Sequence, residues 1–187
     1  SLRGSRKKKR TLFYPGYHEL AYLHPNRFTP DPSVSAEAGI SPGERYFVLR
    51  FNAFRAHHDK GARGLSMEQK LILVRLLEEY GRVIITTEKE IPQELAKYRL
   101  SVSPEKIHSL LYYSTAFVGD SQTMSSEAAV MGVPSLRCNT FAGRLSSLEE
   151  EEKRYRLTYA FTPAEFDRLI EKTKELLAIP GLKEEWQ

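Results

Sequence analysis

The residues best suited to chemistry lie at positions 119–137, which read G-D-S-Q-T-M-S-S-E-A-A-V-M-G-V-P-S-L-R. The apolar residues 116–118 precede them and are typical of the end of a buried parallel strand. Small polar residues that favour a helix N-terminus come next: Asp120, Ser121, Thr123 and Ser125. The predicted helix carries one carboxylate, Glu127, and ends at Gly132 before Pro134.

A strand that runs directly into a helix N-terminus forms an anion site. The first-turn N–H groups have no partner inside the helix, and the helix dipole favours negative charge. Glu127 lies about one turn further in, where a carboxylate can accept hydrogen bonds from a vicinal diol such as a ribose. Phosphate plus ribose indicates a nucleotide site. The same spacing is equally typical of an ordinary strand–turn–helix with a solvated glutamate, so spacing alone leaves both interpretations open.

A second candidate cluster lies in the polar loop 52–64, which contains His57 and His58. At the end of a strand these imidazoles are candidates for acid/base catalysis or for phosphate contact. Adjacent histidines point in divergent directions and rarely share one ion, so no metal site is expected. Arg63 adds positive charge near the start of the next helix, which suits a phosphate. A solvated polar loop is the alternative for either histidine alone.

The remaining titratable candidates have simpler interpretations. His108 lies beside apolar residues in a predicted helix and is expected to be a packed or surface histidine. Cys138 is the only cysteine, which excludes an internal disulfide and a cysteine-based zinc cluster. The acidic run 149–152 is expected to be a solvated helix face. No G-x-G-x-x-G, P-loop, G-x-S-x-G or H-E-x-x-H pattern occurs, so no dinucleotide cofactor is expected.

The elements that must position these residues alternate in type along the chain. Ser66 and Gln69 form a capping box that opens a helix ending near Gly81. Strands are predicted at residues 46–51, 82–87, 100–102, 116–119, 133–136 and 157–161, and further helices at 91–98, from 104 to 113, and at 163–178. Strands that are apolar on both faces and alternate with helices predict a Rossmann-like, doubly wound, mainly parallel α/β sheet with helices on both faces. Ligands of such sheets bind at the carboxyl ends of the strands, where the polar loops 52–64, 86–90 and 120–125 fall.

Composition bounds the class of protein. The 187 residues are 41% hydrophobic and 28% charged, which suits one globular domain, and no apolar run reaches the length of a membrane span. With no signal peptide and one cysteine, we expect a cytoplasmic location. Six positive charges of the net +4 fall within residues 1–10, and removing them leaves the rest at −2. These residues are therefore expected to be a disordered basic arm, with possible electrostatic contact to an anionic membrane, and we expect no nucleic-acid partner.

The chain between the basic arm and the first strand is unusual. Residues 11–45 contain repeated Pro and Gly and predict an extended lead-in, with one or two helical turns near residues 19–23. Such a lead-in is more natural as a segment that crosses from, or packs against, another domain. The nucleotide-binding domain itself is expected at residues 46–187.

Residues 103–137 resemble the nucleotide-binding segment of GT-B-fold proteins, and among these the non-hydrolysing UDP-N-acetylglucosamine epimerases. The epimerase segment likewise has a helix, an apolar strand, Asp-Ser, two small residues, a Glu-Ala pair and a Gly-x-Pro stop. The chain is still more similar to an uncharacterised prokaryotic family of GT-B-like proteins. That similarity also includes residues 14–28 and 49–59.

The resemblance implies specific roles. Ser121, with the backbone of Gln122 and Thr123, would hold the diphosphate, and Glu127 would bind the ribose hydroxyls. The epimerases carry a sugar- and phosphate-binding loop rich in His and Arg at the position of Arg55, His57 and His58. They also have two glycines where this chain has Gln122 and Thr123, so side chains narrow the space beside the phosphates here.

The resemblance further implies that this chain is one half of a GT-B fold, with its partner Rossmann-like domain N-terminal to the lead-in. The expected function is that of the UDP-type nucleotide-sugar-binding half of a glycosyltransferase in surface-polysaccharide or glycan synthesis, inactive alone and with no resident cofactor. An epimerase-like domain and a non-catalytic binding scaffold are the alternatives. The oligomeric state is not predicted.

Overall fold

The computed structural model describes residues 16–51, 63–87, 91–144 and 146–186. The predicted basic arm and the candidate residues Arg55, His57 and His58 lie outside these ranges.

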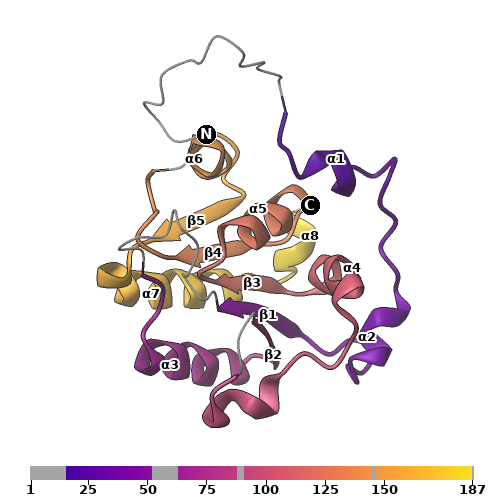
Figure 1. Cartoon of the computed structure of the whole chain (residues 1–187), viewed down its shortest axis with the longest axis horizontal. Coiled ribbons are helices and arrows are strands. Elements are labelled where there is room, and N and C mark those ends of the chain that lie inside the picture. The colour runs from indigo at the N-terminus through magenta and orange to yellow at the C-terminus, as the bar shows by residue number, and fades with distance from the viewer. Residues whose placement is uncertain (1–15, 52–62, 88–90, 145, 187) are drawn as a thin grey trace.

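Five parallel strands form one sheet in the order β2-β1-β3-β4-β5 (Figure 1). The strands are β1 (Tyr46–Phe51), β2 (Arg82–Thr87), β3 (Ala116–Gly119), β4 (Ser135–Cys138) and β5 (Thr158–Phe161). The α-helices are α1 (Leu20–Leu23), α2 (Ser33–Glu37), α3 (Met67–Glu78), α4 (Ile107–Tyr113), α5 (Gln122–Val130), α6 (Ser146–Lys153), α7 (Phe166–Leu177) and α8 (Leu182–Trp186). Short 3₁₀ helices are η2 (Gln93–Tyr98), η3 (Pro104–Lys106) and η4 (Pro163–Glu165). The predicted doubly wound α/β fold is confirmed.

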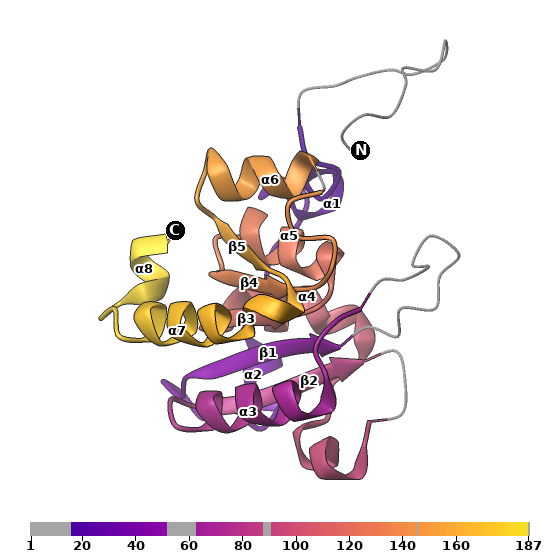
Figure 2. The same ribbon diagram turned by 90° about the vertical axis from the view of Figure 1, so that its left-hand side faces the viewer.

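Alternating strand residues fill two separate cores, one on each face of the sheet. Phe47 and Leu49 of β1 pack on one face against buried residues of α3 and α7, such as Leu73 and Leu169. Val48 of β1 packs on the other face, in a core that includes buried residues of α4 and α5. Figure 2 shows α3 and α7 in front of the sheet and α4 and α5 behind it. Burial on both faces explains why the central strands are apolar at nearly every position.

The lead-in segment is part of the second core. Leu23 of α1, and Val34, Ala38 and Ile40 in and after α2, are all buried there. The lead-in therefore packs against this domain through two short helices. Asp31 stabilises the turn before α2 within the Pro-rich stretch, because its carboxylate accepts the Ser33 N–H at 2.9 Å.

The local signals located most elements. Ser66 and Gln69 make the predicted capping box, with reciprocal bonds of 3.2 and 2.9 Å. The strand predicted at 100–102 is wrong, because Arg99 forms only an isolated bridge to Ile85 before the chain turns into η3. The segment predicted as a helix at 91–98 is the 3₁₀ helix η2. Within the residues described, no helix is long and apolar enough to cross a membrane.

Candidate functional site

The winding of the sheet reverses between β1 and β3. The chain goes from β1 outward to β2 and then returns to form β3 on the other side of β1. The connections that leave β1 and β3 therefore diverge at the carboxyl ends of these strands, which is where open α/β sheets bind ligands. The segment 119–125, singled out from the sequence, begins at this switch point.

Close backbone packing holds the end of β3 against β1. A Cβ on Gly119 would lie 2.3 Å from the Arg50 carbonyl oxygen, so the site admits only glycine. The Asp120 N–H donates to that same carbonyl oxygen at 3.0 Å. Directly after β4, the buried Asn139 amide donates to the Asp120 carbonyl oxygen at 2.9 Å. The turn into α5 is thus fixed by both neighbouring strands.

The N-terminus of α5 is accessible at this edge. Ser121 is the N-cap, and its hydroxyl accepts the Met124 N–H at 3.4 Å. The N–H groups of Gln122 and Thr123 have no partner inside the helix. Gln122 is half-buried and Thr123 exposed, and no acidic residue occupies the first turn to neutralise the helix dipole. The arrangement can accept an anion.

Glu127 is not a solvated glutamate. Its side chain faces α1 and α4 and is 9% exposed. Its Oε1 accepts the Tyr22 hydroxyl at 2.9 Å and lies 3.0 Å from His108 Nε2. Glu127 is six residues beyond Ser121, about 9 Å along the helix axis, which is compatible with one nucleotide touching both. His108 is half-buried and bound to this carboxylate, a pairing that the sequence did not reveal.

Arg63 lies at the same edge of the sheet. Its backbone N–H donates to the Thr140 hydroxyl at 3.0 Å, and its carbonyl oxygen accepts the Thr140 N–H at 3.0 Å. Because Thr140 follows β4, the exposed Arg63 stands beside the loops that leave β3 and β4. At this position the positive charge of Arg63 can attract an anion toward the N-terminus of α5 over a long range.

A cavity of about 430 Å³ lies at the carboxyl ends of β1 and β2. Polar groups on its wall are Arg50, Thr86, Thr87 and Arg99, and apolar residues such as Leu100 and Val102 complete it. Arg50 Nη1 donates to the Thr86 hydroxyl at 3.0 Å. This cavity was not predicted from the sequence, although Arg50 is the one charged residue in the apolar run Y-F-V-L-R-F and could have indicated it.

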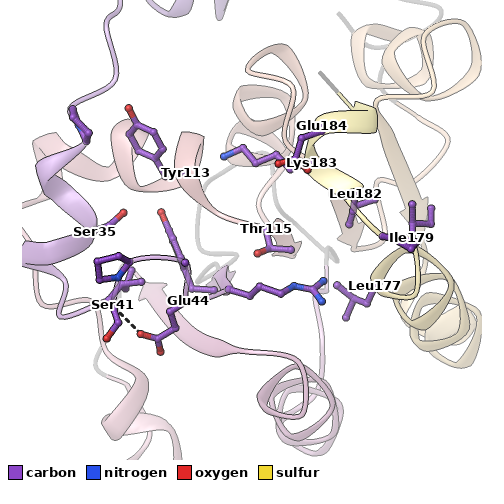
Figure 3. A pocket seen from close by; sticks show the side chains of 18 of the residues that line it. Ser35, Ser41, Glu44, Tyr113, Thr115, Leu177, Ile179, Leu182, Lys183 and Glu184 are labelled. Atoms are coloured by element: carbon purple, nitrogen blue, oxygen red, sulfur yellow. Dashed lines mark hydrogen bonds between the residues drawn. The ribbon is translucent and has the colours of Figure 1, made fainter.

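A larger cavity, of about 770 Å³, lies at the opposite edge, where β1 begins. Figure 3 shows Tyr113, Thr115 and Lys183 around it, and Glu44 accepting the Ser41 N–H at 2.8 Å. The Lys183 ammonium donates to the Tyr112 carbonyl oxygen, and burial lowers the pKa of Lys183 to about 8. This contact fastens α8 to α4. The cavity is far from the switch point in the topology and is not part of the candidate site.

A sealed polar cluster lies between α5, α6 and the strands β4 and β5. Arg137 is fully buried, and its Nη2 lies 3.8 Å from Glu149 Oε1 and 3.8 Å from Glu152 Oε2. Glu151 is also fully buried and accepts the Ser126 hydroxyl at 2.5 Å. The expectation of a solvated acidic helix face is therefore wrong, because Glu149 and Glu151 are buried and the half-buried Glu152 also reaches Arg137. An arginine inside a buried strand is the sequence signal that predicts such partners.

Cys138 is buried in the core that α3 and α7 cover, and burial raises the pKa of its thiol to about 12. A buried, protonated thiol is a poor nucleophile at neutral pH, and Cys138 is part of the core.

No protein-family model and no curated protein matches the chain. Among solved structures, the glycotransferase of kitacinnamycin is similar at 14% identity and a TM-score of 0.49, over 81% of this chain and 38% of that one. The wall teichoic acid polymerase TagF is similar at 8% identity and a TM-score of 0.42, over 90% of this chain and 42% of that one. The chain thus spans about two fifths of either protein. Similarity at this level does not imply a shared substrate.

Proposed function

We propose that this chain is the donor-binding half of a GT-B-like glycosyltransferase and binds a UDP-type nucleotide sugar at the carboxyl edge of its sheet. The observation that carries the proposal is the accessible N-terminus of α5 at the switch point between β1 and β3. Further support comes from the resemblance of residues 103–137 to nucleotide-binding segments of GT-B proteins.

In this proposal the N–H groups of Gln122 and Thr123, with the Ser121 hydroxyl, receive the diphosphate. Donors fixed in place before the reaction stabilise the charge that develops on a diphosphate leaving group. Arg63 contributes positive charge at the same edge. The side chains of Gln122 and Thr123 replace the glycines of the epimerases, but each residue still supplies its backbone donor.

Glu127 binds the ribose hydroxyls, and the cavity beside Arg50 and Thr86 receives the nucleobase. A carboxylate is an acceptor only, so it pairs naturally with two adjacent hydroxyl donors. The cavity and the α5 N-terminus flank the end of β1 on its two sides, because Arg50 lines the first and its carbonyl oxygen binds the turn into the second. One extended nucleotide can reach both.

Glycosyl transfer requires an acceptor and acid/base groups that we place in a second, N-terminal domain and in the loop with His57 and His58. The chain alone therefore binds a nucleotide weakly and turns over little. A role in surface-polysaccharide or glycan synthesis follows from the same resemblance.

The test is an amide NMR titration of the chain with UDP, GDP and UDP-N-acetylglucosamine. We expect the Gln122 and Thr123 resonances to shift most. Gln122→Pro removes one donor at the first helical position, where proline is tolerated and where the extended Ser121 (ψ 125°) accepts a following proline.

Loss of one charge-assisted hydrogen bond should weaken UDP binding roughly ten-fold. Met67→Pro, at the first position of α3 after the equally extended Ser66, is the matched control and should bind UDP like the parent chain. Equal affinity of Gln122→Pro and the parent chain, or shifts confined to other residues, would overturn the proposal.

A further inference from the structure

Two donors from distant parts of the chain converge on one oxygen of Glu127. The Tyr22 hydroxyl, 105 residues away in sequence, donates to Oε1 at 2.9 Å, and His108 Nε2 lies 3.0 Å from the same atom. An ionised carboxylate only accepts, so His108 must carry its proton on Nε2. Among the described residues no donor reaches Oε2. The two oxygens of this carboxylate are therefore not equivalent.

Both donors are held in place by packing. Leu23, next to Tyr22, is buried in the core that contains Met124 and Ala128 of α5. The His108 ring lies 5.7 Å from the Tyr22 ring and 6.2 Å from the Phe28 ring, centroid to centroid. The lead-in thus encloses His108 between two of its aromatic rings and brings the Tyr22 hydroxyl to α5.

The hydrogen bonds to Oε1 compensate for the burial of the Glu127 carboxylate and leave its other oxygen, Oε2, available to a ligand. A nearly buried carboxylate requires hydrogen bonds to offset the loss of water. Here Oε1 receives both bonds, which leaves the lone pairs of Oε2 for another donor. Burial, and then the bond to Glu127, raise the pKa of the Tyr22 phenol above its ordinary value, so Tyr22 remains a donor at neutral pH.

We infer that Tyr22 and His108 are positioning residues of the nucleotide site: they hold Oε1 of Glu127 and reserve Oε2 for the ribose hydroxyls. This inference rests on the proposed function, because it concerns the carboxylate that is proposed to bind the ribose hydroxyls. The lead-in then belongs to the nucleotide site, because it supplies one of the two groups that orient its ribose-binding residue.

The experiment compares the affinity of the full chain for UDP and 2′-deoxy-UDP, and for GDP and 2′-deoxy-GDP, by calorimetry. In whichever of the two pairs binds, the parent chain should have a higher affinity for the ribonucleotide than for the deoxyribonucleotide. Glu127→Gln should lose most of that preference. Tyr22→Phe removes only the hydroxyl and should reduce the preference roughly two- to ten-fold. Tyr155→Phe changes an exposed tyrosine two residues after α6; it is the matched control and should keep the preference.

His108 needs a pair of variants. His108→Leu should reduce the ribose preference like Tyr22→Phe, whereas His108→Gln keeps an amide donor and should restore part of it. If His108 had only a structural role, its substitution would weaken the binding of both nucleotides of a pair equally and leave the preference unchanged. Near-ultraviolet circular dichroism shows whether each variant retains its fold.

The possible failures are distinguishable. If the parent chain binds no nucleotide, or prefers no ribose, the proposed function is wrong and this inference falls with it. If Glu127→Gln loses the preference while Tyr22→Phe and His108→Leu retain it, only the inference is wrong. Tighter ribonucleotide binding by Tyr22→Phe would also overturn it, since Tyr22 would then be a competitor for Glu127.

Discussion

Ser126 and Glu127 are neighbours in α5 but belong to two polar clusters that differ in their exposure to water. Ser126 donates to Glu151 in a cluster that contains the fully buried Arg137. Glu127 accepts from Tyr22 and His108, whose side chains are partly exposed. Both clusters contain buried carboxylates, but the first is closed by α6, whereas the second retains an unused acceptor oxygen.

The difference in exposure between the two clusters suggests different roles, one in stability and the other in ligand binding. Removing one partner from a group of buried charges leaves the others uncompensated and destabilises the fold, and charges buried in this way cannot touch a ligand. A carboxylate at a reachable position with one satisfied oxygen is suited to recognise hydroxyl groups. We therefore expect substitutions in the first cluster to change unfolding free energy, and substitutions in the second to change nucleotide affinity.

The largest effect is expected from Arg137→Met. It removes the buried cation between Glu149 and Glu152 and should lower the free energy of unfolding by about 3–5 kcal/mol. Urea denaturation measures it. The control is Arg154→Met, which breaks an exposed pair with Glu150 and should leave the free energy of unfolding nearly unchanged. Similar losses in the two variants would contradict the sealed-cluster interpretation.

Glu151 should make the first cluster sensitive to pH. Burial raises the pKa of Glu151 from an ordinary 4.5 to about 7. Because the folded pKa is the higher one, the stabilisation from its protonated form is complete below pH 4.5 and is lost as pH rises through 7.

Glu151→Gln mimics the protonated side chain, so its advantage over the parent chain should grow to roughly 2–3 kcal/mol at pH 8 and vanish near pH 4. Thermal or urea unfolding across this range tests the expectation. The adjacent, exposed Glu150→Gln should follow the parent curve. A pH-independent difference between Glu151→Gln and the parent chain would show that Glu151 is not protonated in the fold.

For the second cluster, Glu127→Ala should weaken UDP binding about ten-fold, or about 1.4 kcal/mol. Its unfolding free energy should fall by only about 1 kcal/mol, because water can reach Tyr22 and His108 once the carboxylate is gone. Calorimetry and urea denaturation on the same sample give both numbers. An unchanged UDP affinity would remove the ribose assignment.

The smallest effect is expected from Ser121→Ala at the start of α5. The cap bond to the Met124 N–H is long, at 3.4 Å, so its loss should cost only about 0.5–1 kcal/mol of unfolding free energy. Ser66→Ala, which removes the complete capping box of α3, is the comparison and should cost more. The reverse order would mean that Ser121 carries more of the turn than this geometry indicates.

Local patterns predicted much of the fold. Apolar runs located the five strands to within two residues, and the Ser66–Gln69 pair located the start of α3. The predictions failed at residues 100–102, because three apolar-rich residues do not determine whether an edge strand pairs. The assignment of a diphosphate to Ser121, Gln122 and Thr123 stays a prediction, as does that of Arg55, His57 and His58, which lie outside the described residues.

The amino-acid sequence by itself determined the alternation of strands and helices, the parallel sheet and the place where β3 runs into α5. The strands and helices depend on neighbours within a few positions along the chain, and their strict alternation then favours parallel strands joined by crossovers. Only the tertiary structure decided which carboxylates are sealed and which are reachable. The partners of Glu127 and Glu151 come from segments 105, 19 and 25 residues away, and the burial of a charged group depends on what packs against it rather than on the residues beside it in sequence.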